Sequence, residues 1–446
     1  MTTPFRNISV SLIVFVLLGL ALRVAFVLMA DSTSLTFHSG GSDAPSYVLL
    51  AENLGNHRGY SYAGQLSAFR PPGYPLLIAG FMAVFGSHYI SALRVLQLAL
   101  GILTIGICSA TAAQLFGRKE AQATFVIGLF MPTLVFTTAQ VLTECLAALM
   151  TALFLNCLVT QCEKSDVRSA WGLGLTAGCE SLIRSNAAAL PLFAGWAVLR
   201  TQNKNSRAFR AALVLLLPVL IVMPWFVRNE LAFRGRVFYS TQTGANAVQG
   251  VITPQGRTQP GDSEKLIDAM GWCISQLETN DASRLFLPSE VELNAHALRV
   301  VPTLWRQQRW HAVSLLVRKV SDFWLSTDQL MDTGSFDMRE RLIRSAGVWT
   351  YWAGLLLAML GWFTLRKTRP QLAQILLLYA LGFTILHLPL VMSTRIRIPL
   401  MDPLVVILSG AGCLRVARKM TRSRMEPPYS SDSLNQTPGS VIRSVL

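Results

Sequence analysis

Long apolar runs separated by short polar gaps dominate the chain. A helix that spans a membrane needs about 20 consecutive apolar residues. Eight runs approach or exceed this length, and they cover residues 8–29, 90–116, 121–139, 144–162, 209–227, 346–365, 371–391 and 398–416. The pattern predicts an all-α membrane protein, a polytopic helical bundle of about ten transmembrane segments within a range of about nine to twelve. The first run is too long for a signal-peptide core and ends without an A-x-A-like site, so we interpret it as a retained helix.

Two further segments come from residues 170–199, where short apolar pieces flank the sequence LIRSN at 182–186. Each piece has about 13 residues, and at roughly 1.5 Å per residue such a helix cannot cross a core about 30 Å thick. We expect a short hairpin here, with Arg184 buried in protein or facing a water-filled cavity. Arg23, inside the first apolar run, is either buried and paired or snorkels outward.

The composition agrees with a membrane protein and explains the charge. The chain has 446 residues, of which 52% are hydrophobic and 14% charged, and its formal net charge is +15. The basic residues gather in the gaps at 118–119, 164–168, 200–210 and 366–369 and in the tail after 414. This is the positive-inside pattern, which assigns those gaps to the cytoplasm. We expect a multi-pass protein of the cell (inner or plasma) membrane with both termini cytoplasmic, and no nucleic-acid partner.

This topology divides the chain into four regions. An N-terminal transmembrane module covers 1–227 and includes a first outer loop at 30–89. An extracytoplasmic region covers 228–345, and C-terminal transmembrane helices cover 346–416. The remaining residues, 417–446, form a basic cytoplasmic tail that we expect to be disordered.

Both outer segments contain helical patterns. In the first, apolar residues at helical spacing, Tyr47, Leu50, Ala51 and Leu54, precede Gly55. This spacing is typical of an amphipathic helix that lies along the membrane surface. In the second, the sequence after Pro288 reads as helix, and LLVRKVSDFWL at 315–325 suits an interfacial helix that returns to the bilayer.

Several common functional motifs are absent. The sequence has no GxxxxGK loop for ATP, no D-x-D clamp for a nucleotide sugar and no HExxH zinc motif. The seven cysteines form neither a disulfide framework nor a CxxC metal site. We expect neither a cofactor nor a metal ion.

Charged residues at the outer face carry the candidate chemistry. Asp43 lies at the start of the first-loop helix and could act as a general base, or it could cap that helix. Arg70 precedes two prolines, Pro71 and Pro72. Its forked donors could bind a phosphate, or the side chain could snorkel to lipid headgroups.

Three more arginines lie on the outer side, where the positive-inside rule does not favour cations. They are Arg228, at the end of one span, and Arg395 and Arg397, before the last span. Together they indicate an anionic ligand held at the outer interface. Glu144 begins a span on the same side, where it either caps its helix with Thr143 or faces the site.

Four motifs, in order, resemble those of the GT-C-fold integral-membrane glycosyltransferases, the group of the dolichyl-phosphate-mannose protein mannosyltransferases and the lipid A aminoarabinose transferase. The motifs are D-x-x-x-Y-x-x-x-A-x-x-L from Asp43, RPPGYPLL from Arg70, PWFVRN with the later STQTGAN, and RIRIPLMDPL from Arg395. The likeness covers about residues 8–416. It departs from the family at Ala44, where many members have a second acid, and at Ser46, where the aminoarabinose transferase has an arginine.

The resemblance implies a GT-C-like fold and an inverting glycosyltransferase. A polyprenyl-phosphate sugar would donate a hexosyl or pentosyl group to a lipid, glycan or protein acceptor at the outer face. Asp43 would be the catalytic carboxylate, and the donor phosphate would contact Arg70, Arg228, Arg395 and Arg397. Further residues that could line the site are Tyr47, His57, Arg58, Tyr74, Glu144 and Arg184.

Two alternatives remain at this stage. A multi-pass transporter or lipid flippase would place its site near the bilayer midplane on broken helices, whereas the charges here lie at the outer face. A GT-C-fold protein that has lost its activity and acts as an assembly partner is compatible with the missing second acid at Ala44.

Overall fold

The chain is almost entirely helical in a computed structural model, which describes residues 10–29, 43–62, 64–201, 203, 205–252, 290–307, 309–310, 312–327 and 338–425. The helices of the first half are α1 (Val10–Met29), α2 (Ala44–Gly55), α3 (Gly73–Phe85), α4 (Tyr89–Phe116), α5 (Arg118–Phe130), α6 (Pro132–Phe136), α7 (Glu144–Lys164), α8 (Val167–Ile183), α9 (Leu190–Leu199) and α10 (Arg207–Phe233). Those of the second half are α11 (Gln242–Ile252), α13 (Glu290–Gln307), α14 (Ala312–Leu325), α15 (Met338–Thr368), α16 (Pro370–His387) and α17 (Thr394–Met425).

Short elements complete the described structure. Strands β1 (Ser61–Tyr62) and β2 (Gln65–Leu66) form a small antiparallel hairpin in which Ser61 pairs with Leu66. Three 3₁₀ turns, at Gly86–His88, Thr137–Ala139 and Ser185–Ala189, join neighbouring helices. Sheet structure in the described residues is therefore confined to this hairpin, within the segment 30–89 predicted as the first outer loop.

The membrane-spanning helices coincide with the predicted apolar runs. Among the described residues, 7 helices are long and apolar enough to cross a membrane, or up to 8 if the α5–α6 pair, bent by 55°, counts as one span. The expected ten segments are not confirmed, because α8 and α9 are too short or too polar to qualify. They do form the predicted hairpin, split at Arg184.

The bend between α5 and α6 explains the arginine inside α1. Pro132 has no N–H to donate to the carbonyl of Gly128, four residues earlier, so that carbonyl keeps only a long backbone bond, from the Met131 N–H at 3.3 Å. A poorly satisfied carbonyl is costly inside a bilayer. Arg23 is fully buried and donates to that carbonyl and to the carbonyl of Leu134, both at 2.9 Å. Arg23 is thus buried and paired, and it does not snorkel.

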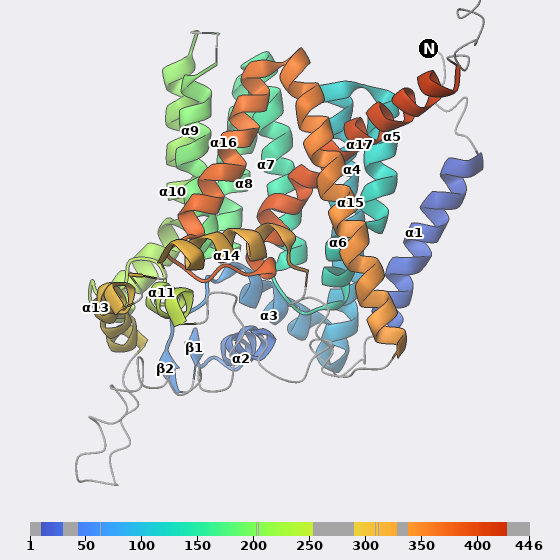
Figure 1. The fold of residues 1–446 in the computed structure, drawn as a ribbon. Coiled ribbons are helices and arrows are strands. Elements are labelled where there is room, and N and C mark those ends of the chain that lie inside the picture. Colours follow the sequence, from blue (N-terminus) through green and yellow to red (C-terminus); the bar gives the residue numbers. More distant parts are fainter. Residues whose placement is uncertain are drawn as a thin grey trace, which may run out of the picture.

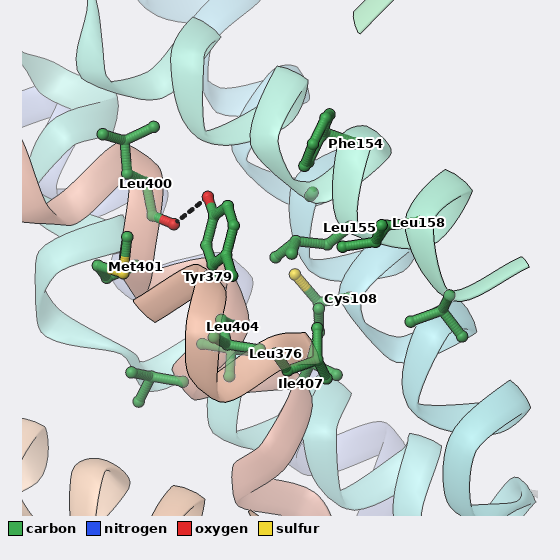
Figure 2. Close-up of a cluster of buried hydrophobic side chains, with 14 of the residues drawn as sticks. Cys108, Phe154, Leu155, Leu158, Leu376, Tyr379, Leu400, Met401, Leu404 and Ile407 are labelled. Atoms are coloured by element: carbon green, nitrogen blue, oxygen red, sulfur yellow. Dashed lines mark hydrogen bonds between the residues drawn. The ribbon is translucent and has the colours of Figure 1, made fainter. Parts of the chain in front are cut away.

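The core lies where α4, α7, α16 and α17 meet. Figure 2 shows aliphatic and aromatic side chains from these helices packed around Tyr379, whose hydroxyl donates to the carbonyl of Leu400 at 2.8 Å. Helices α15 and α17 cross so closely that a Cβ at Gly361 would collide with the carbonyl of Leu408. Close packing of small residues is the usual way in which helices associate in membranes.

The elements outside the spans gather at one end of the bundle. In Figure 1, α2, the β-hairpin, α11 and α13 cluster at the bottom of the view, and α14 lies across the helices of the bundle. The described parts of residues 228–345 are therefore mainly helical, as expected for this region. Helix α17 continues to Met425, so residues 417–425 are helical and their predicted disorder is wrong, while 426–446 lie outside the described residues.

Candidate active site

Asp43 precedes α2, but its side chain does not cap that helix. The carboxylate makes no hydrogen bond to the first turn, and Ser46 instead donates its hydroxyl and its N–H to the Asp43 backbone carbonyl. One carboxylate oxygen, Oδ1, pairs with Arg70 Nη2 at 2.5 Å, and the other, Oδ2, with Arg395 Nη1 at 3.0 Å. The capping interpretation is therefore wrong, and Asp43 is one centre of an ion-pair cluster.

Arg70 is buried, which excludes the snorkelling alternative. Only 5% of the residue is exposed, and its guanidinium lies over the rings of Tyr47 and Phe69, with centroid distances of 5.0 and 4.8 Å. Besides pairing with Asp43, Arg70 donates through Nε to the Ser46 hydroxyl at 3.2 Å. The proline pair after it leads directly into α3, so the chain turns into the bundle immediately beyond the guanidinium.

Glu144 is a second carboxylate of the same cluster. It is 1% exposed, and its Oε1 lies 2.8 Å from Arg395 Nε and 3.6 Å from Arg184 Nη1. Thr143 makes no capping bond to α7; its hydroxyl accepts from Arg184 at 2.7 Å. Helix capping by Thr143 and Glu144 is therefore also wrong. Arg395 bridges the two carboxylates, Asp43 from the first outer loop and Glu144 from the bundle.

The cluster carries a net positive charge. Three arginines (70, 184 and 395) and two carboxylates (43 and 144) leave a formal excess of one positive charge. Helices α2, α3, α7 and α17 all begin within three residues of a cluster member, and helix N-termini carry partial positive charge. Burial alone would raise the pKa of Asp43, but Arg395 and Arg70 hold that pKa at about 2. Asp43 is therefore ionised at neutral pH.

Arg228 and Arg397 make their contacts with residues outside this cluster. Arg228 donates to the backbone carbonyls of Ser67 at 2.7 Å and Tyr60 at 2.9 Å, so it anchors the first outer loop. Arg397 is fully buried, pairs with Asp402 at 3.1 Å and donates to backbone carbonyls at the end of α14. The structure thus brings Arg70 and Arg395 to Asp43 but gives the other two arginines other partners.

The remaining predicted lining residues divide in the same way. Tyr47 lies under Arg70, and its ring meets that of Tyr74 edge-on at 5.4 Å. Tyr74 is buried and donates its hydroxyl to Gln97, so it packs behind Tyr47 and holds that ring in place.

His57 and Arg58 are exposed at the opposite end of α2, about 20 Å from Asp43 by the helical rise. The structure does not bring them to the cluster.

Comparisons with known proteins show a family likeness and the fold. Residues 69–227 match the family model described as dolichyl-phosphate-mannose-protein mannosyltransferase. The fold matches the oligosaccharyltransferase AglB from Archaeoglobus fulgidus in complex with an inhibitory peptide and a dolichol-phosphate, with a TM-score of 0.54 and 14% identity over 93% of this chain and 51% of that one. The protein has the GT-C fold. The expected resemblance is confirmed.

Two other solved structures are also similar to the chain. An Archaeoglobus fulgidus oligosaccharyltransferase tethered to an acceptor peptide containing the NVT sequon matches with a TM-score of 0.54 and 14% identity over 93% of this chain and 50% of that one. ArnT from Cupriavidus metallidurans bound to undecaprenyl phosphate has 18% identity and a TM-score of 0.41, over 92% of this chain and 79% of that one. The chain spans about half the length of the archaeal enzyme. None of the curated protein sequences compared with the chain matches it significantly.

The sequence identified several residues of the cluster but not which of them pair with one another. It selected Asp43, Arg70 and Arg395 but did not connect Glu144 to Arg395, because the two are 251 positions apart. One available signal separates Arg395 from Arg397: residues two apart on a helix point in nearly opposite directions. No more than one of them could therefore face the same ligand.

Proposed function

We propose that this protein is an inverting glycosyltransferase that moves a sugar from a polyprenyl-phosphate carrier to an acceptor at the outer face of the membrane. The observation that carries the proposal is the Asp43 carboxylate held between Arg70 and Arg395 in a GT-C fold. The donor sugar is a hexosyl or pentosyl group, and the acceptor is a lipid, glycan or protein. N- and C-termini are on the cytoplasmic side in this proposal.

Arg70 and Arg395 are the proposed phosphate ligands. A guanidinium offers forked donors that match phosphate oxygens, and both arginines already contact an oxyanion, the carboxylate of Asp43. The excess positive charge of the cluster and the surrounding helix N-termini favour an added anion. The AglB structure that shares the fold contains a dolichol-phosphate, which supports a lipid phosphate as the ligand.

The chemistry follows from this placement. The acceptor attacks the anomeric carbon from the face opposite the phosphate, its new bond to that carbon forms, and the carbon–oxygen bond to phosphate breaks. The electron pair of the broken bond goes to the phosphate oxygen, where Arg70 and Arg395 stabilise the growing negative charge. The acceptor proton goes to the carboxylate of Asp43, which acts as general base.

Donor binding prepares Asp43 for this role. In the empty site the two arginines depress the pKa of the carboxylate to about 2, which makes it a weak base. A bound phosphate shares the same arginines and adds negative charge nearby, and both effects raise the proton affinity of Asp43. The carboxylate thus becomes a stronger base only when the donor is present.

Membranes that contain wild-type protein or the Asp43→Asn variant test the proposal. Radiolabelled polyprenyl-phosphate sugars are supplied one at a time, and label in the acceptor fraction is counted. We expect transfer from one of them by wild type and a loss of about 10² to 10⁴-fold in the variant. The matched control is Glu52→Gln, which removes an exposed carboxylate from α2. Lipid exchange between leaflets without transfer would identify a flippase, and neither activity would identify an inactive assembly partner.

A further inference from the structure

The backbone that leads into Arg70 is held from two sides. Within its own loop, Tyr60 accepts from the Ser67 N–H at 3.0 Å and donates its hydroxyl to the carbonyl of Arg70 at 2.9 Å, and the other bonds come from residues far away in the sequence. Ser67 is 1% exposed and Ala68 is 0% exposed, although both belong to an outer loop. Their distant partners come from α10, from the segment between α10 and α11, and from α13. Buried backbone polar groups need such partners, but partners from three separate elements fix position as well.

Glu290, the first residue of α13, makes the most direct of these contacts. Its Oε2 accepts from the Ser67 hydroxyl at 2.8 Å, and its Oε1 accepts from the backbone N–H of Ala68. The same Ser67 hydroxyl accepts from the N–H of Phe69 at 3.1 Å. A chain of hydrogen bonds therefore runs from Glu290 to the residue next to Arg70. Bonds to a charged carboxylate are stronger than neutral ones.

The opposite side of the segment is held as well. Arg228 donates to the carbonyl of Ser67 at 2.7 Å, the N–H of Thr241 to the carbonyl of Ala68 at 3.2 Å, and the Ser240 hydroxyl to the carbonyl of Phe69 at 3.1 Å. Ser67 is thus bound from two sides: its hydroxyl contacts the carboxylate of Glu290, and its carbonyl contacts the guanidinium of Arg228. Since Phe69 also lies under the Arg70 guanidinium, a displaced segment would move that guanidinium.

We propose that Glu290 is a positioning residue that sets the place of the Arg70 guanidinium through Ser67 and Ala68, and thereby couples docking of α13 to binding of the donor phosphate. The inference rests on the proposed function, because it assigns Arg70 to that phosphate. It has a reciprocal consequence: whatever increases phosphate affinity by docking α13 must itself be strengthened by phosphate.

Variants of Glu290 and Ser67 test the coupling. The purified full chain is compared with Glu290→Ala, Glu290→Gln and Ser67→Ala, and Glu292→Gln on the same helix is the control. We expect Glu290→Ala to raise the KM for the donor about tenfold, with the KM for the acceptor unchanged, because two charge-assisted bonds are lost. Glu290→Gln keeps an acceptor and a polar group in place, so it restores part of the donor affinity. Glu292→Gln leaves both constants at wild-type values.

A double variant distinguishes positioning from general stability. If Glu290 acts through Arg70, the variant Arg70→Ala/Glu290→Ala has the donor KM of Arg70→Ala alone. Independent, multiplying losses would overturn the proposal, as would a Glu290→Ala effect on kcat and thermal stability with no change in donor KM. Ser67→Ala supplies the same test if Glu290→Ala does not fold.

A binding measurement keeps this inference separate from the proposed function. Tritiated undecaprenyl phosphate is titrated onto the protein in detergent and followed by scintillation proximity. Should wild type transfer no sugar, the proposed function fails, but weaker binding by Glu290→Ala than by Glu292→Gln would still support the coupling. Equal binding by these two variants overturns it.

Discussion

Replacing Arg395 with glutamine tests the centre of the site, because this side chain joins both carboxylates. The change removes the 3.0 Å contact to Asp43 and the 2.8 Å contact to Glu144. Glu144, 1% exposed, then keeps only Arg184 at 3.6 Å as a charged partner. Removing one partner of a fully buried ion pair costs about 3–5 kcal/mol in general. Because the Arg395 side chain is 24% exposed, we expect a smaller loss of stability, seen as a lower melting temperature in detergent.

The same replacement of Arg395 should slow catalysis and change its pH dependence. Loss of one preorganised donor to the leaving phosphate lowers kcat by about 10² to 10³-fold. The pKa of Asp43 is held at about 2 in the free enzyme, so the wild-type kcat/KM should not fall as pH decreases from 7 to 5. In the variant the strongest influence that lowers this pKa is gone, so it rises, and the acid limb of kcat/KM moves to higher pH.

The assay is sugar transfer by purified protein between pH 4.5 and 8, with Arg168→Gln as the control. Arg168 is exposed and lies in the first turn of α8, away from the cluster, so its loss matches the charge change without touching the site. A variant at Arg395 that transfers sugar within twofold of wild type, with the same acid limb, would refute the reasoning.

Three further predictions concern packing and the excluded residues. Arg23→Leu removes two hydrogen bonds at 2.9 Å from the α5–α6 bend, whose carbonyls then keep the longer bonds from the Met131 N–H at 3.3 Å and the Thr137 hydroxyl at 3.4 Å. It should lower stability by about 2–4 kcal/mol; a large drop in detergent melting temperature checks this, and an unchanged melting temperature contradicts it. Gly361→Ala should destabilise the α15–α17 crossing, whereas Gly382→Ala, with open space around it, should not; equal melting temperatures for the pair would count against the packing. Replacing His57 and Arg58 together by alanine should leave the rate of sugar transfer unchanged, since both are exposed and far from Asp43. A tenfold lower rate would show that they belong to the site after all.

The positions of the spans could be predicted from the sequence, because each helix that crosses a membrane needs its own run of about 20 apolar residues. Seven predicted spans correspond to long helices for that reason. The bend in the eighth run was also signalled, by Pro132 in its interior. The interpretation of 417–425 failed because a basic, polar composition suggested disorder where α17 simply continues beyond the bundle.

The site was harder to predict, since its chemistry depends on tertiary contacts. Topology placed Asp43, Arg70, Glu144 and Arg395 at the same face, but only the folded chain shows that Arg395 bridges the two carboxylates. The local alternatives, capping and snorkelling, stayed open at the level of sequence because they need no distant partner. Glu290 carried no sequence signal at all, because its role comes from hydrogen bonds to residues 222 and 223 positions away.

Single-turnover transfer by wild type and Asp43→Asn, with saturating amounts of the donor that wild type accepts, tests the central claim most directly. The account predicts that both proteins bind the donor with similar affinity, and that the variant transfers sugar at least about 10²-fold more slowly. It also predicts that the wild-type product has the anomeric configuration opposite to that of the donor. Full transfer by Asp43→Asn, or a product that retains the donor configuration, would contradict it.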